Sequence, residues 1–231
     1  MKQTAGLYIH IPFCSVKCMY CDFYSITDRN NDIPIFIDSL IKEIELSKNH
    51  AKDNWRFDTI FIGGGTPSLL EPKWIEVILN TLTKTFDTSS VKEITMETNP
   101  GEAPLERLKG YKELGVNRLS IGFQSFDSKI LKFLDRLHSP EDSIKTFKNA
   151  RLAGFNNINA DLIFNIPGQS LERWKKDIEH LISLDLEHIS TYSLTVEKGT
   201  PLNSEVKKGN IIMPDEDIDI AMYQSGLNKL I

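Results

Sequence analysis

The chain has 231 residues, 40% hydrophobic and 26% charged, an ordinary composition for a globular protein built as one large domain or a barrel. Its formal net charge of −5 argues against nucleic acid as the main partner, because binding to phosphates needs a basic surface. No apolar run in the sequence approaches the ~18–20 residues of a membrane-spanning helix, so we do not expect an integral membrane protein.

Short apolar runs rich in β-forming residues alternate along the chain with segments of helical periodicity. The expected strands are residues 7–11, 59–62, 93–97, 118–121, 158–164 and 188–194. The expected helices are residues 33–47, 72–84, 104–114, 140–153 and 171–184. This alternation predicts an α/β protein, in which βαβ units with right-handed crossovers build a parallel sheet.

Six strand–helix units predict an incomplete (β/α)6 TIM-like barrel. A full barrel of eight units would normally need ~250 residues, so it is the less favoured interpretation. A doubly wound open sheet is the structural alternative. Ser139 followed by Pro140 and two acidic residues has the pattern of a helix N-terminus, which indicates where one of the helices begins.

All three cysteines of the chain lie in one short segment, Cys14-Ser-Val-Lys-Cys18-Met-Tyr-Cys21, directly after the first expected strand. Three thiolates on one loop can hold a [4Fe–4S] cluster and leave one of its four irons open. An open iron can bind a substrate or cofactor, which predicts a reactive cluster rather than a closed electron-transfer centre.

Two other roles for these cysteines are less favoured. A disulfide would leave one cysteine over, and the chain shows no signal peptide. Structural zinc takes four protein ligands, and His10, the nearest candidate for the fourth, lies within an expected strand. Free cysteines and the absence of a targeting segment predict a reducing, cytoplasmic location.

The C-x3-C-x2-C motif resembles that of radical S-adenosylmethionine (SAM) enzymes. The likeness is greatest to the branch that holds coproporphyrinogen III dehydrogenases and HemW-type heme chaperones, and it covers residues 8 to about 201. The segments that carry it, besides the cysteines, are Tyr8-Ile-His-Ile-Pro-Phe13, Gly63-Gly-Gly-Thr-Pro67, Glu97-Thr-Asn-Pro100, Gly122-Phe-Gln-Ser125 and Asp161-Leu-Ile163.

These motifs fall at the carboxyl ends of the expected strands, where parallel barrels place their active sites. The resemblance implies that Gly64 and Gly65, with the neighbouring Thr66, hold the amino group of SAM beside the cluster. Glycines there let backbone approach a ligand, although three glycines after a strand can also form only a tight turn. Glu97 could accept hydrogen bonds from two ribose hydroxyls; the alternative is a solvated carboxylate.

Five more residues are candidates. Gln124, Arg136 and Asp161 match positions that contact SAM or a second nucleotide in the family, although Arg136 could be an ordinary surface arginine. Tyr8 is expected either to support the cluster or cofactor or to be a core residue. Tyr20, just before Cys21, is expected to shield the cluster or to pack on adenine.

The resemblance implies reductive cleavage of SAM to methionine and a 5′-deoxyadenosyl radical, with an electron donor such as flavodoxin or ferredoxin. Phe23 stands where the dehydrogenases carry a further cysteine, and the N-terminal arm of those enzymes has no counterpart before Tyr8. Both departures favour a heme chaperone that delivers heme to respiratory proteins. A dehydrogenase acting on a porphyrinogen in heme biosynthesis, and a non-catalytic heme carrier with a structural cluster, are the alternatives.

Residues 1–210 are expected to form the radical SAM core domain, and residues 211–231 the start of a C-terminal region. Pro214 and the acidic residues after it indicate a helix whose apolar pattern reaches Ile231 without a C-cap. Because related proteins carry a further C-terminal domain, we expect a truncated region here rather than a natural terminus.

Overall fold

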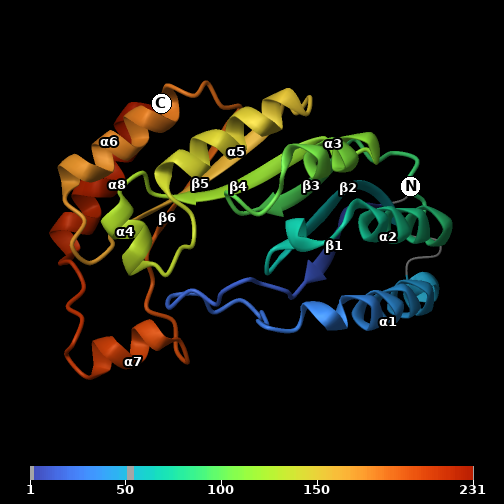
Figure 1. Ribbon diagram of the computed structural model, residues 1–231, viewed down its shortest axis with the longest axis horizontal. Helices are drawn as coiled ribbons and strands as arrows, with labels where there is room; N and C mark the ends of the chain where they lie inside the picture. The colour runs from blue at the N-terminus through green and yellow to red at the C-terminus, as the bar shows by residue number, and fades with distance from the viewer. Residues whose placement is uncertain (1–2, 51–54, 231) are drawn as a thin grey trace.

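The computed structural model describes residues 3–50 and 55–230. In these ranges six strands form one parallel sheet in the sequential order β1-β2-β3-β4-β5-β6. The sheet curls into a half-barrel with helices along its outer side (Figure 1). The strands are β1 (Gln3–Ile11), β2 (Trp55–Gly64), β3 (Glu93–Thr98), β4 (Arg118–Gln124), β5 (Ile158–Phe164) and β6 (His188–Ser193).

Sequential strand order excludes the doubly wound alternative, in which the order reverses at a switch point. The described strands pair only with their neighbours, so β1 and β6 are the two edges and the barrel is incomplete. The expected (β/α)6 architecture is therefore confirmed. The α-helices are α1 (Ile33–Leu46), α2 (Pro72–Thr85), α3 (Leu105–Glu113), α4 (Ser128–Phe133), α5 (Pro140–Leu152), α6 (Leu171–Ile182), α7 (Pro201–Lys207) and α8 (Glu216–Leu230).

The expected strands and helices occur with bounds shifted by a few residues, and the short helices α4 and α7 were not predicted. Three 3₁₀ turns, Asn30–Asp32, Ser47–His50 and Pro67–Leu69, complete the secondary structure of the described ranges. The expected N-terminus at Ser139 is confirmed: its side chain accepts from the Asp142 N–H, and the Asp142 carboxylate accepts from the Ser139 N–H.

The two faces of the sheet differ in chemistry, because successive side chains of a strand point to opposite sides. On the outer face, apolar residues such as Ile121 of β4 and Leu162 of β5 belong to the buried core beneath the helices. On the inner face, Ser120 of β4 donates a hydrogen bond to Asp161 of β5. The main apolar core thus lies on the outer face, and the inner face carries polar side chains on β4 and β5.

Helix α8 packs against α6, as Figure 1 shows. The Trp174 indole N–H of α6 donates to the Met222 carbonyl of α8 at 2.7 Å, and Gly226 allows the ring a close approach.

The expected domain boundary at residue 210 stays a prediction. Within residues 3–50 and 55–230, no helix has the length and apolar character that crossing a membrane would take.

Candidate cofactor site

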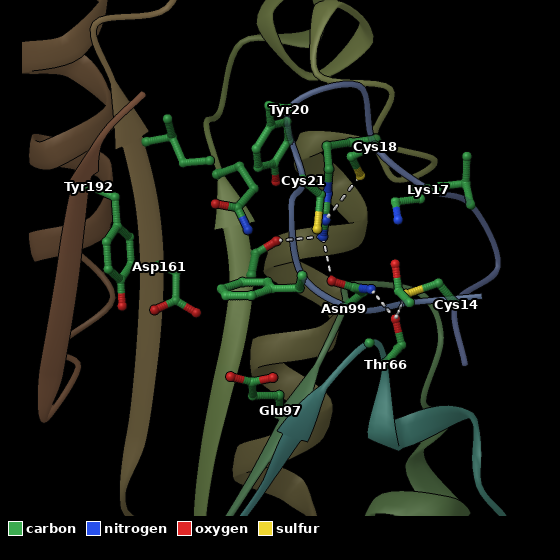
Figure 2. A pocket seen from close by; sticks show the side chains of 18 of the residues that line it. Cys14, Lys17, Cys18, Tyr20, Cys21, Thr66, Glu97, Asn99, Asp161 and Tyr192 are labelled. Atoms are coloured by element: carbon green, nitrogen blue, oxygen red, sulfur yellow. Dashed lines mark hydrogen bonds between the residues drawn. The ribbon is translucent and has the colours of Figure 1, made fainter. Parts of the chain in front are cut away.

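A cavity of about 630 Å³ opens where the carboxyl ends of the strands meet the loop after β1. This volume lies in the usual range of small-molecule sites. Figure 2 shows the thiols on one side and the carboxyl groups of Glu97 and Asp161 on another. Of the predicted site residues, those lining it are Cys14, Cys18, Cys21, Tyr20, Gly64, Gly65, Thr66, Glu97, Gln124, Arg136 and Asp161.

The loop that carries the cysteines is closed at its base. The Cys14 N–H donates to the Ile26 carbonyl at 2.9 Å, and the Ile26 N–H donates to the Pro12 carbonyl at 2.8 Å. Phe13, fully buried, anchors the same base edge-on against Phe36 of α1. These contacts hold the loop over the cavity, with all three thiols free and lining it.

Three thiols are available to a metal group in this cavity, and thiolates are the usual ligands of iron–sulfur clusters. No three His, Cys, Asp or Glu side chains of the described residues are gathered closely enough to hold one metal ion. His10, the candidate fourth zinc ligand, is engaged: its Nδ1 accepts from the Tyr8 hydroxyl at 3.0 Å and its Nε2 donates to the Tyr24 carbonyl at 2.8 Å. A cubane takes its thiolates on different irons, so three thiols that line one cavity are compatible with it.

The glycine loop packs against the cysteine loop. The Gly65 N–H donates to the Ile11 carbonyl at 2.8 Å, and the Thr66 N–H donates to the Phe13 carbonyl at 2.7 Å. A Cβ on Gly65 would lie 2.6 Å from the Phe13 carbonyl oxygen, so only glycine permits this approach. Gly64 has a φ of +114°, and its N–H donates to Glu97 at 3.0 Å.

Because these three N–H groups are already bonded within the protein, the glycine loop is not a cradle for phosphate. A carbonyl oxygen of this turn can still contact a ligand, because carbonyls accept hydrogen bonds from an ammonium group. The tight-turn role and the ligand role considered for these glycines are therefore compatible.

Two carboxyl groups face each other across the inner sheet surface. Burial raises the pKa of Glu97 to about 7, against the opposing effect of the Gly64 N–H, and the negative charge of Asp161 adds to the rise. Burial also raises the pKa of Asp161, although Asn159 at 2.8 Å and Ser120 at 3.1 Å donate hydrogen bonds to it. Glu97 is therefore a partly desolvated acceptor rather than a solvated strand-end carboxylate.

Arg136 lines the cavity and is not an ordinary surface arginine. Its guanidinium donates from Nη1 to the Cys18 Sγ at 3.7 Å and from Nη2 to the Gly122 carbonyl at 3.1 Å. Nη2 also donates to the side-chain oxygen of Asn99. In the sequence, Asn99 stood out only as part of the motif Glu97-Thr-Asn-Pro100. It directly follows β3, which ends at the cavity, and this position is the signal that could have identified it.

Gln124 ends β4 in an unusual backbone conformation, with a φ of +66°. Non-glycine residues hold such a conformation only when their surroundings enforce it. Here Asp177 of α6 accepts from the Ser125 hydroxyl at 2.6 Å and from the Phe126 N–H at 3.0 Å. Asp177 is a second residue that the sequence did not reveal, because nothing in its local pattern differs from an ordinary helix position.

The tyrosines fall in different places. Tyr20 lines the cavity next to the thiols, and burial raises the pKa of its hydroxyl. Tyr8 is 58% exposed, stacks on Phe61 and does not line the cavity, so it occupies neither a core position nor the cavity wall. Tyr192 of β6 lines the cavity from the far edge of the sheet (Figure 2).

The sequence of this chain is similar to those of known proteins. Residues 8–181 match the family model of the radical SAM superfamily. The mitochondrial radical S-adenosyl methionine domain-containing protein 1 of Danio rerio is 37% identical over 226 residues, 98% of this chain and 51% of that protein. The heme chaperone HemW of Bacillus subtilis is 37% identical over 226 residues, 96% of this chain and 59% of the chaperone.

A solved structure shares the fold over almost the whole chain. Coproporphyrinogen III oxidase (HemN) of Escherichia coli superposes with a TM-score of 0.82 at 25% identity, covering 99% of this chain and 52% of that enzyme. The chain thus spans little more than half the length of these relatives.

Proposed function

Because the chain belongs to the radical SAM superfamily, we propose that Cys14, Cys18 and Cys21 bind a [4Fe–4S] cluster and that the cavity beside them binds SAM. The observation that carries this proposal is that three thiols from one loop line a cavity whose other walls combine apolar side chains with the polar groups of Glu97 and Arg136. When bound, such a cluster supplies the electron for reductive cleavage of SAM.

The residues of the cavity would divide the binding of SAM among them. Glu97 can accept hydrogen bonds from the ribose hydroxyls, and the carbonyls of the Gly64–Gly65 turn can accept from the amino group. Arg136 puts a positive charge beside the thiols, where it can also pair with a carboxylate. Tyr20 lines the cavity next to the thiols, where it would restrict water and so strengthen each of these interactions.

For the whole protein we propose a heme chaperone that passes heme to respiratory proteins in the cytoplasm, with flavodoxin or ferredoxin as electron donor. Two observations support it. Curated relatives at 36–37% identity are heme chaperones. Phe23, the residue at the position of the dehydrogenases' additional cysteine, is 66% exposed and lines the cavity mouth, where an apolar ring suits a tetrapyrrole better than a fourth thiol would.

Anaerobic reconstitution tests the cluster. The wild-type chain should hold about four irons with visible absorption, and Cys18→Ala should lose most of both. Ser15→Ala, a change on the same loop that removes no thiol, is the matched control and should keep them. If the variant with all three cysteines replaced by alanine still bound iron with the same absorption, the assignment would fail.

The second candidate is an oxygen-independent coproporphyrinogen III dehydrogenase, which the structural likeness to the Escherichia coli oxidase favours. The deciding assay incubates the longest natural form of the protein anaerobically with SAM, reductant and coproporphyrinogen III, with that oxidase as positive control. The chaperone proposal expects heme binding and no protoporphyrinogen IX. Stoichiometric or faster formation of protoporphyrinogen IX would establish the dehydrogenase instead. If the protein cleaves SAM to 5′-deoxyadenosine but forms no protoporphyrinogen IX, it is an active radical SAM protein. A carrier that has only a structural cluster would not cleave SAM.

A further inference from the structure

A continuous chain of hydrogen bonds joins two of the three thiols. The Thr66 hydroxyl lies 3.6 Å from the Cys14 Sγ and donates to it. The Asn99 side-chain N–H₂ donates to the same hydroxyl at 2.8 Å. On its other side Asn99 accepts from Arg136, whose Nη1 donates to the Cys18 Sγ at 3.7 Å. Figure 2 shows this path, with Asn99 at its centre.

The chemistry of the neighbours determines which way the Asn99 amide points. Arg136 has donors only, so it must face the amide oxygen. Glu102 offers a carboxylate oxygen at 2.8 Å, which must face the amide nitrogen, and Thr66 completes that side. The position therefore needs a short side chain with an acceptor at one point and a donor at the other. Aspartate would put a second carboxylate against Glu102, and an aliphatic residue would make none of these bonds.

The backbone leaves room for this arrangement. A Cβ on Gly122 of β4 would lie 2.7 Å from the Gln124 Nε2, and 3.3 Å from both the Asn99 amide oxygen and the Arg136 Nη2. The Gly122 carbonyl also accepts from Arg136, so the guanidinium is held at two points before it reaches Cys18. Glycine within β4, otherwise unfavourable in a strand interior, is explained by the close approach of Gln124 together with Arg136 and Asn99.

We propose that Asn99 is a positioning residue, which aligns the Thr66 donor on Cys14 and the Arg136 donor on Cys18 and so sets the reduction potential of the cluster. The inference rests on the proposed function. Hydrogen bonds to ligand sulfurs stabilise the extra negative charge of a reduced cluster and raise its potential. Asn99 strengthens the Thr66 bond by donating to that hydroxyl, because bonds in a chain polarise one another.

The test measures iron content and midpoint potential, by anaerobic redox titration followed by electron paramagnetic resonance, on the reconstituted 231-residue chain. Asn99→Ala and Thr66→Val should keep the iron of the wild type but shift the midpoint to more negative values. Thr66→Ser keeps the hydroxyl and should restore the wild-type midpoint. The double variant should shift less than the sum of the two single shifts, because Asn99 acts in part through Thr66.

Asn117 supplies the matched control at the opposite end of the sheet. Its amide accepts from the Ile94 N–H at 2.8 Å and donates to the Lys92 carbonyl at 2.7 Å, so it bridges segments as Asn99 does but far from the thiols. Asn117→Ala should lower thermal stability without moving the midpoint.

The outcomes separate this inference from the proposed function. A wild-type chain that binds no iron sinks the proposed function. Iron bound by the wild type, together with an unshifted midpoint in Asn99→Ala, overturns the inference alone. Should Asn99→Ala fail to fold, Asn99→Asp takes its place, because it keeps the acceptor for Arg136 but cannot donate to Thr66 when ionised; an unshifted midpoint would again overturn the inference.

Discussion

Glu97 shows how a single residue can serve binding at the expense of stability. In the unfolded chain this carboxyl ionises near 4.5, the ordinary pKa of a glutamate side chain, whereas burial raises the pKa to about 7 in the folded protein. Between these values the folded form keeps a proton that the unfolded form has released, so the contribution of Glu97 to stability falls as pH rises. The carboxylate that a ribose would need is therefore unfavourable in the ligand-free protein.

Replacing Glu97 by glutamine should remove this pH dependence. Glutamine keeps the acceptor for the Gly64 N–H and can donate toward Asp161, but it carries no charge. We expect Glu97→Gln to stabilise the cofactor-free protein by at most about 3 kcal/mol at pH 8 and by less than about 1 kcal/mol at pH 5. Its SAM affinity should fall about tenfold or more, because a charged acceptor is lost.

Urea unfolding at the two pH values and calorimetry with SAM measure these effects. Glu76→Gln, on the exposed side of α2, is the control and should change stability by no more than about 0.5 kcal/mol at either pH. Equal stability of Glu97→Gln and the wild type at pH 8 would contradict the burial argument, and unchanged SAM affinity would remove Glu97 from the SAM site.

At the scale of elements, α6 determines how β4 ends. Asp177, buried on the inner side of α6, binds the backbone and side chain of the turn that follows Gln124. The turn continues into α4, where the Asp127 side chain caps the helix by accepting from two N–H groups. A helix on the outer side of the sheet thus maintains the conformation of a residue that lines the cavity.

We expect Asp177→Ala to destabilise the protein by about 2–4 kcal/mol, because the buried Ser125 hydroxyl would lose its acceptor and the partly buried Phe126 N–H would lose its partner. Asp177→Asn should cost less, since its amide oxygen can still accept from Phe126. Urea unfolding measures both. Glu172→Ala changes an exposed carboxylate on the same helix and should leave stability near that of the wild type. If Asp177→Ala unfolded at the wild-type urea concentration, α6 would have no such role.

At the scale of the whole molecule, the cysteine loop is the part of the site whose far end is exposed to solvent. Hydrogen bonds and Phe13 hold its base, while Asp22, Phe23 and Tyr24 are exposed. A cluster bound by three cysteines would tie this loop across the cavity. Ligands that bind only the folded state stabilise it, and metal sites contribute their binding energy to folding.

Removal of iron with a chelator should therefore lower the melting temperature and expose the loop to cleavage. Limited digestion with chymotrypsin should cut the iron-free chain near Phe23 and Tyr24 and spare the reconstituted chain. Cleavage at Tyr223, exposed on α8, should be the same in both and is the internal control. Equal cleavage of the loop with and without iron would show that the loop does not depend on a cluster.

Local patterns in the sequence predicted most of the strands and helices of this protein and the candidate ligands of its cluster. The strands are apolar runs and α5 begins at a recognisable cap, because hydrophobic period and capping chemistry act over a few neighbouring residues. The cysteine spacing is local in the same sense, since all three thiols lie on one loop. Helices α4 and α7, with 6 and 7 residues, are too short to show a period.

Tertiary structure alone decided the environment of the site. Arg136 meets Cys18 across 118 residues of sequence and Asn99 across 37, and no local pattern encodes such pairs. The raised pKa of Glu97 depends on burial, and the exposure of Tyr8 depends on the openness of the sheet edge. The candidate cluster ligands could be predicted because the cysteines lie close together in the sequence. The residues that surround and orient them could not, because they come together only when the curvature of the sheet brings six strand ends to one place.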